Sequence, residues 1–274
     1  MKSNFIFAAL ASLVIVTSAC KKPEDPAVKD DDKKPAENIT LAVENKPSAK
    51  AEDDNKSSGI YKGTFVGSSG TFKLIIQPND ISGIITVDGK TYKLTTDDIS
   101  SANLGSAINN AEFTDASNTI KLTFSVAADG SNPTVAIVIT SHTDVKATVF
   151  KETSQHQVKV YEGYTYYTYQ EDGIQCIYHL NVLLGRDTLA KAASRYSETK
   201  DLPGSSNGEE CDMENWTNDY TYILNNNKIN IYRWVRESGT SVVKDYLFGR
   251  DINFSDAQIQ SVDGADSIRL IRKL

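Results

Sequence analysis

The sequence predicts an all-β protein built from two antiparallel modules, each a meander that closes as a barrel or folds as a sandwich. Three observations lead to this prediction. Short runs of alternating apolar and polar residues follow one another from residue 59 to the C-terminus. Turn residues such as Asp88-Gly89 separate these runs, and Asp-Gly between alternating runs is a strong hairpin signal. Helical spacing is confined to short stretches, so strands and turns should account for most of the folded chain.

The N-terminus has the layout of a secretory signal peptide. Lys2 gives it a positive start, an almost unbroken apolar run covers residues 5–16, and small residues lead to Ala19. The apolar run is shorter than the ~20 residues that a membrane-spanning helix needs. No second long apolar run follows it. Residues 1–19 are therefore predicted to direct export and then to be removed.

Cys20, directly after these small residues, resembles the modified cysteine of the bacterial lipobox. In lipoproteins with this motif, the cysteine thiol carries a diacylglycerol and the preceding peptide is cleaved off. The resemblance therefore implies a lipid anchor at Cys20. Thr17 departs from the usual pattern, which has Leu at that position. Ordinary cleavage after Ala19, which would leave a free cysteine, is the alternative.

Lys21, rather than an aspartate, follows the cysteine. By the same resemblance this implies location at the outer membrane, on the periplasmic side or at the cell surface. The segment KKPEDP also resembles the start of surface-exported lipoproteins of Bacteroidota. Several acyl chains, at ~0.8 kcal/mol per buried CH2, suffice for stable anchoring. The membrane is therefore the first predicted partner.

Residues 20–57 are predicted to form a disordered tether behind the anchor. The segment contains no aromatic residue and is rich in Lys, Asp, Glu, Pro and Ala. Such a composition buries too little apolar surface to offset the entropy cost of ordering the chain. The tether would hold the folded part clear of the membrane.

The first module is predicted over residues 58–153. It should contain about seven or eight short strands, because each alternating run is bounded by turn residues. The runs that carry this prediction are GIYKGTFVG, TFKLIIQ, ISGIITV, KTYKLTT, TIKLTFSV, PTVAIVITSH and VKATVFK.

The second module is predicted over residues 154–274. It opens with the Tyr-rich run VKVYEGYTYYTYQ, and GIQCIYHLNVLL should be its hairpin partner. Leu189, Ala192, Ala193 and Tyr196 then fall at helical spacing, which predicts one short helix. A polar loop follows. After it, alternating apolar and polar residues predict further strands in WTNDYTYILN, NKINIYRWV, TSVVKDYLFG, QIQSV and SIRLIRK.

The two modules begin alike. Residues 60–63 read Ile-Tyr-Lys-Gly and residues 160–163 read Val-Tyr-Glu-Gly. The match favours diverged copies of one barrel-like domain, with chance agreement as the alternative. The second module also resembles small lipocalin-like domains of bacterial lipoproteins, in its Tyr/Gly first strand, its hairpin meander and its closing C-terminal strand. That resemblance implies a barrel architecture.

Two cysteines remain after Cys20, namely Cys176 and Cys211. An even pair in an exported protein predicts a disulfide. The chain-entropy model gives such a bridge ~3–4 kcal/mol of stabilisation. A metal site with two thiols is the alternative, but no His or Cys stands at ligand spacing to either cysteine.

No motif for catalysis, metal binding or cofactor binding is found. The chain has 36 Asp and Glu against 29 Lys and Arg, so it lacks the basic footprint expected for nucleic-acid binding. The three histidines, His142, His156 and His179, have no second His or Cys at metal-ligand spacing. Ser241 and Lys244 match SxxK by letters, but in a strand their side chains would face opposite sides.

Aromatic residues form the one suggestive cluster. Successive side chains of a strand alternate between its faces, so Tyr164 and Tyr166 should share one face and Tyr167 and Tyr169 the other. An exposed aromatic row could stack on sugar rings, and a lined cavity could hold an apolar ligand. The alternative is an ordinary half-buried sheet. The candidate ligand-binding residues are Tyr164, Tyr166, Tyr167, Tyr169, Trp216 and Trp234.

The sequence therefore favours a non-enzymatic lipoprotein of the cell envelope. Its β modules would bind a glycan, a small apolar ligand or a partner protein. Two alternatives stay open: an envelope hydrolase whose site is assembled across the modules, and an accessory subunit of an outer-membrane complex. The second alternative predicts an exposed apolar patch or an unpaired edge strand.

Overall fold

The computed structural model describes residues 41–169, 174–185, 189–201, 215–236, 242–246, 253–263 and 266–274. These residues form seventeen β-strands and two short 3-10 helices, η1 (Ala51–Asp53) and η2 (Ser101–Asn103), which confirms the all-β prediction. None of the helices among them is long and apolar enough to cross a membrane. The predicted signal peptide, Cys20 and the tether up to residue 40 lie outside the described residues.

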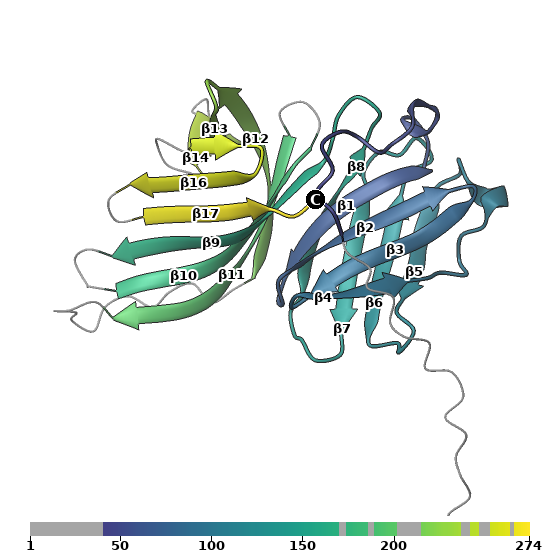
Figure 1. Cartoon of the computed structure of the whole chain (residues 1–274), viewed down its shortest axis with the longest axis horizontal. Helices are drawn as coiled ribbons and strands as arrows, with labels where there is room; N and C mark the ends of the chain where they lie inside the picture. Colours follow the sequence, from purple (N-terminus) through teal and green to yellow (C-terminus); the bar gives the residue numbers. More distant parts are fainter. Residues whose placement is uncertain are drawn as a thin grey trace, which may run out of the picture. The chain divides into compact units, whose positions relative to one another are not determined.

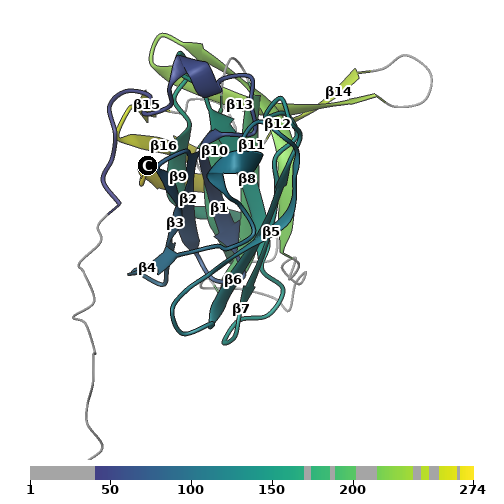
Figure 2. The ribbon, with the colours of Figure 1, turned by 90° about the vertical axis from the view of Figure 1, so that its right-hand side faces the viewer.

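The first eight strands form two antiparallel sheets from residues 59–152. One sheet has the order β4-β3-β2-β1-β8 and the other the order β5-β6-β7. The two sheets lie on opposite sides of the first module (Figure 1, Figure 2). The bounds are β1 (Gly59–Val66), β2 (Gly70–Gln77), β3 (Asp80–Val87), β4 (Lys90–Leu94), β5 (Ile108–Thr114), β6 (Ile120–Val126), β7 (Thr134–Ile139) and β8 (Lys146–Glu152).

These strands follow one another around the module in chain order. A single bridge between Thr95 and Thr114 links the end of β4 to β5, and β7 packs beside β8. The last strand, β8, then pairs with the first strand, β1. The arrangement is an up-and-down meander in which the β4–β5 seam carries this single bridge, while β7 and β8 pack beside each other without a paired ladder between the described strands. It encloses one hydrophobic core, in which Tyr61 stacks edge-on against Phe124 at 4.7 Å between ring centroids.

The remaining strands form one nine-stranded antiparallel sheet. Its order is β14-β13-β12-β11-β10-β9-β17-β16-β15, so the first strand of the module again pairs with its last. The bounds are β9 (Lys159–Tyr169), β10 (Ile174–Leu184), β11 (Leu189–Asp201), β12 (Trp216–Asn225), β13 (Lys228–Arg236), β14 (Val242–Tyr246), β15 (Asn253–Ser255), β16 (Gln258–Asp263) and β17 (Asp266–Arg272).

This sheet curls into a nearly closed barrel. Its edge strand β15 returns to the β12–β13 turn, where the backbone N–H of Phe254 donates to the carbonyl oxygen of Asn227 at 2.9 Å. The interior is filled by apolar side chains from most of its strands, among them Tyr161, Leu180 and Leu270. The barrel-like architecture expected for the second module is therefore confirmed.

The two meanders use their shared opening motif in the same way. Tyr61 and Tyr161 both point into their cores and are fully buried. The next residue, Lys62 or Glu162, therefore points outward, because side chains alternate along a strand. The common origin of the modules stays a prediction, but the motif has the same structural role in both.

Apolar residues from both meanders pack together where their outer faces meet. Val158, Val160, Leu183 and Leu274 form a small buried cluster, against which Phe150 of β8 also packs. Nearby, the side-chain amide of Asn181 on β10 donates to the backbone oxygen of Phe65 on β1 at 2.9 Å. The described residues, which begin at Leu41 and end at Leu274, accordingly belong to one compact unit.

The predicted helix around residues 189–196 is wrong, because this segment is strand β11. It pairs with β10 along one edge and with β12 along the other. Ala190 and Ala192 point into the barrel, where their small side chains fit the filled interior. Pairing on both edges overrides the helix preference of alanine. A bulge between Ile177 and Tyr178 shifts the register of the pair.

The predicted C-terminal limit of the tether is also wrong, since residues 41–57 belong to the folded unit. Leu41 packs on the cluster where the meanders meet, and Asp53 and Ser57 are buried. The charged composition of the segment predicted disorder, but its charged side chains make specific buried contacts. Glu44, for example, binds two lysines of the first module.

Candidate binding site

Three side chains form a row across the outer face of the barrel-like sheet. Arg269 of β17 lies directly opposite Tyr164 of β9, and Tyr164 lies directly opposite His179 of β10. Their neighbours Leu180 and Leu270 point into the barrel, so the row points outward. The rings of Tyr164 and His179 are in contact, with centroids 4.4 Å apart and planes tilted by 42°.

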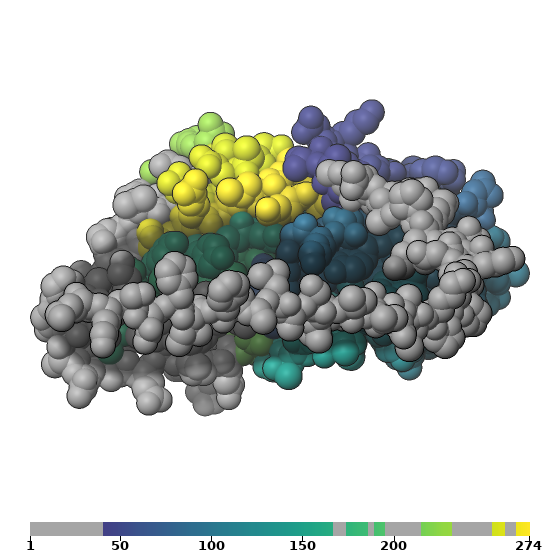
Figure 3. Space-filling view, turned by 60° about the horizontal axis from the view of Figure 1, so that its bottom comes forward, coloured from purple at the N-terminus to yellow at the C-terminus, as the bar shows by residue number. Residues whose placement is uncertain are grey.

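A cavity of about 460 Å³ opens over this row. We call it the outer basin. Most of its wall comes from β9, β10 and β17, and Ser69 in the β1–β2 turn contributes from the first module. In Figure 3 the C-terminal residues, in yellow, lie beside the green residues of the second module on one face. The lining residues are Ser69, Glu162, Gly163, Tyr164, Tyr166, His179, Arg269, Ile271 and Lys273.

Glu162 is the most unusual polar group of the outer basin. Its side chain is only 18% exposed, and its Oε1 atom is buried without a hydrogen-bond partner among the described residues. The nearest cation is Lys273, whose Nζ lies 4.0 Å from Oε2. Burial raises the pKa of Glu162 to about 6, against the weaker opposing effect of Lys273. An unsatisfied buried acceptor of this kind favours a ligand that donates a hydrogen bond.

Arg269 supplies a cationic group on β17, directly opposite Tyr164 and on the side away from His179. Arg269 is exposed to solvent, and its side chain has no ion pair or hydrogen bond within the described part of the chain. The protein as a whole carries a formal net charge of -7. An unpaired guanidinium in the wall of a cavity is therefore a local feature and does not follow from the overall charge.

Gly163 allows β9 and β17 to approach closely beneath the basin. A Cβ atom at this position would collide with the backbone oxygen of Arg269. Only glycine therefore fits here without a shift of one strand. The close approach holds Arg269 beside Tyr164.

The predicted aromatic cluster is divided between the two faces of the sheet. Tyr164 and Tyr166 both line the outer basin, as expected for residues that share a face. Trp216 packs against the barrel interior instead. The side chains of Tyr167, Tyr169 and Trp234 lie outside the described part of the structure.

Four charged or titratable residues of the basin were not among the candidate residues predicted from the sequence: Glu162, His179, Arg269 and Lys273. Only Glu162 carried a signal, because it occupies the charged position of the repeated opening motif. Arg269 and Lys273 reach the site because β17 pairs with β9, which lies about a hundred positions earlier in the chain. A local sequence pattern does not predict which distant strands pair.

Cys176 is buried and disulfide-bonded. Its predicted partner, Cys211, lies outside the described residues, so the pairing of these two cysteines stays a prediction.

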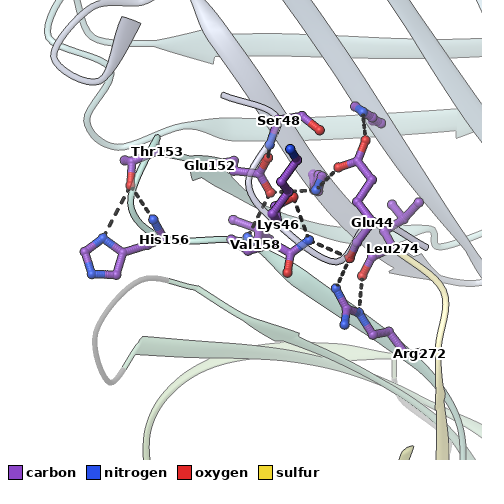
Figure 4. A network of polar contacts seen from close by, with 12 residues as sticks. Glu44, Lys46, Ser48, Glu152, Thr153, His156, Val158, Arg272 and Leu274 are labelled. Atoms are coloured by element: carbon purple, nitrogen blue, oxygen red, sulfur yellow. Dashed lines mark hydrogen bonds and ion pairs between the residues drawn. The ribbon is translucent and has the colours of Figure 1, made fainter. Parts of the chain in front are cut away.

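A buried ion-pair network joins residues 41–48 to both meanders (Figure 4). Lys62 is 1% exposed, and its Nζ lies 2.6 Å from Oε2 of Glu152 and 2.8 Å from Oε2 of Glu44. Burial alone would raise the pKa of Glu44, but hydrogen bonds from Lys62 and Lys73 lower it to about 2. Arg272 donates to the backbone oxygens of Glu44 and Leu274. All these charges have partners, so the network is structural.

A second cavity, of about 390 Å³, lies beside β8, β11 and β12. Its polar groups are largely engaged in internal contacts. Asp54 accepts from the backbone and hydroxyl of Ser154, and Lys151 donates to the backbone oxygen of Asp53. Lys191 lies over the ring of Phe150 at 4.9 Å. This cavity offers fewer free groups to a ligand than the outer basin does.

Among the described residues, no three His, Cys, Asp or Glu side chains come together in a way that could hold a metal ion. Comparisons with family models, curated proteins and solved structures gave no match for this chain.

Proposed function

We propose that this protein is a non-enzymatic, lipid-anchored protein of the outer membrane that binds a glycan in the outer basin. One observation carries the proposal: within the described residues, the exposed ring of Tyr164 lies opposite Arg269, which has no ion pair or hydrogen bond, and two positions along β9 from Glu162, whose buried Oε1 atom has no partner. The anchor and the location rest on the resemblance of Cys20 and its neighbours to a lipobox.

The composition of the basin suits a sugar better than an apolar ligand. A pyranose ring presents C–H groups on its face and hydroxyls around its rim. Tyr164, which is 39% exposed, offers a flat surface for the face of the ring. Glu162 can accept a hydrogen bond from a hydroxyl, and Arg269 can donate to one. An apolar ligand would leave the buried Oε1 atom of Glu162 unsatisfied.

The lining also favours binding over glycoside hydrolysis. Most glycosidases use two carboxyl groups, about 5–10 Å apart, on either side of the bond that is cleaved. Among the described residues that line the basin, Glu162 is the one carboxylate. The described lining therefore does not present the pair that this chemistry requires.

Replacing Tyr164 by Ala is expected to weaken glycan binding about tenfold or more, equivalent to about 1.4 kcal/mol. The substitution removes the stacking surface and leaves the sheet backbone intact. Tyr164→Phe is the matched control, because it keeps the ring and removes only the hydroxyl. A glycan array followed by titration calorimetry, on protein made as Cys20→Ser, measures both variants. If Tyr164→Ala binds the array ligands as tightly as the unchanged protein does, the outer basin is not the binding site.

The anchor has its own test. Cys20→Ser is expected to move the protein from the membrane fraction to the soluble fraction of the envelope, because no thiol remains to carry lipid. Immunoblots of fractionated cells, with the unchanged protein as control, give the answer. Persistence of the Cys20→Ser protein in washed membranes contradicts the proposed lipid anchor.

A further inference from the structure

We infer that the outer basin selects sugars that carry a carboxylate, such as hexuronic acids, and that Arg269 binds this carboxylate. The inference rests on the proposed glycan-binding function and adds the chemical class of the ligand. It is derived from the placement of the charged side chains around Tyr164.

The first argument is the charge pattern of the lining. Glu162 and Lys273 lie 4.0 Å apart and offset each other's charge. Ile271 of β17 is the strand partner of Glu162; Arg269 precedes it in the chain and Lys273 follows it. Arg269 has no ion pair within the described residues. The basin therefore keeps one uncompensated positive charge in a chain whose formal net charge is -7. A ligand with one negative charge would neutralise it.

The second argument is the chemistry of the guanidinium group. Arginine presents parallel N–H donors that match the two oxygens of a carboxylate, and such charge-assisted pairs are stronger than hydrogen bonds to neutral hydroxyls. Arg269 lies directly opposite Tyr164 in the paired strands. A sugar ring on the tyrosine would therefore place a ring substituent within reach of the guanidinium.

The positive charge of Arg269 and the negative charge of Glu162 are separated within the basin. Ile271 lies between Arg269 and Lys273 in the chain, lines the basin with both of them, and pairs with Glu162 across the strands. Its apolar side chain is 47% exposed. A carboxylate at Arg269 therefore lies two residue pairs along the strands from Glu162, and the ring hydroxyls are left to satisfy the buried Oε1 atom. His179 is the remaining titratable side chain in contact with Tyr164.

The test compares sugars that differ only in the acidic group. The probes are the methyl glycosides of glucuronic and galacturonic acid and the neutral methyl glucoside and methyl galactoside. Affinities come from NMR titration of the entire mature chain made as Cys20→Ser. At least one acidic glycoside is expected to bind tenfold or more tightly than its neutral parent. Arg269→Gln should reduce that ratio to less than twofold, because it weakens the binding of the acidic glycoside more than that of the neutral parent.

Two controls keep the outcomes separate. Lys146→Gln removes an exposed positive charge on β8 that does not line the basin, and it should leave the ratio unchanged. Arg269→Lys keeps the charge but loses the forked donors, so it should give an intermediate ratio. The NMR spectra of the free variants report whether each one is folded.

The failure of each proposal gives a different result. If a neutral glycoside binds as tightly as its acid, or if Arg269→Gln keeps the preference, the inference about Arg269 is overturned and glycan binding stands. If none of the four glycosides binds, the glycan-binding proposal and this inference both fail.

Discussion

Replacing Lys62 by Met is expected to destabilise the folded protein by about 3–5 kcal/mol. The substitution leaves Glu152, which is fully buried, and Glu44 without the cation that lies between them. Removing one partner of a buried pair is costly because the remaining charge is desolvated and uncompensated. Urea unfolding followed by circular dichroism measures the change in the free energy of unfolding.

Lys121→Met is the matched control for this prediction. Lys121 also pairs with a glutamate, Glu112, at 2.7 Å, but both side chains are about half exposed. Exposed pairs contribute less than about 1 kcal/mol, so this variant should unfold almost like the unchanged protein. The double variant Lys62→Met/Glu152→Leu should recover part of the lost stability. If Lys62→Met costs no more than Lys121→Met, the network does not stabilise the fold.

A chain that starts at Ser58 is expected to be less stable than one that starts at Leu41, by at least about 3 kcal/mol. The shorter chain loses the Glu44 carboxylate and the backbone N–H of Ser48, which donates to Oε1 of Glu152 at 2.7 Å. It also loses Leu41 from the cluster between the meanders. Hydrogen bonds to charged groups contribute about 1.5–3 kcal/mol each, so two or three of them account for the expected loss.

The comparison needs a chain in which only the contacts of the segment are weakened. Glu44→Gln in the chain that starts at Leu41 keeps the segment but removes the charge that faces Lys62 and Lys73. It should lie between the two truncations in thermal unfolding. Equal stability of both truncated chains would mean that residues 41–57 add nothing to the stability of the fold, which is what a disordered tether over residues 20–57 requires.

The strands were predictable because their signal is local. In β3, for example, buried residues alternate with partly exposed ones from Gly83 to Val87, as the sequence pattern indicates. The Asp88-Gly89 turn follows, with both residues at positive φ, as the hairpin signal requires. Local alternation and turn chemistry therefore identify most strands of the first module.

The failures have a common physical cause, which is contact between distant parts of the chain. Ala190 and Ala192 belong to a strand because β10 and β12 pair with it on both edges. Glu44 is ordered by Lys62 and Lys73 in the first two strands. Composition and helical spacing report the preference of an isolated segment, and they do not include such partners.

The candidate site was predictable only in its aromatic part. Strand alternation correctly placed Tyr164 and Tyr166 on one face. The residues that give the basin its charge depend on strand register and on the closing pair of β9 with β17. Trp216 illustrates the converse, since a conspicuous aromatic residue turned out to face the barrel interior.

The most direct test of glycan binding in the outer basin is a crystal structure of the Cys20→Ser protein soaked with the acidic glycoside that binds best. We expect the sugar ring to lie on the face of Tyr164, with its carboxylate at Arg269 and a hydroxyl within hydrogen-bond distance of Oε1 of Glu162. A sugar found in the barrel interior near Trp216, or in the cavity beside β8, would contradict the account.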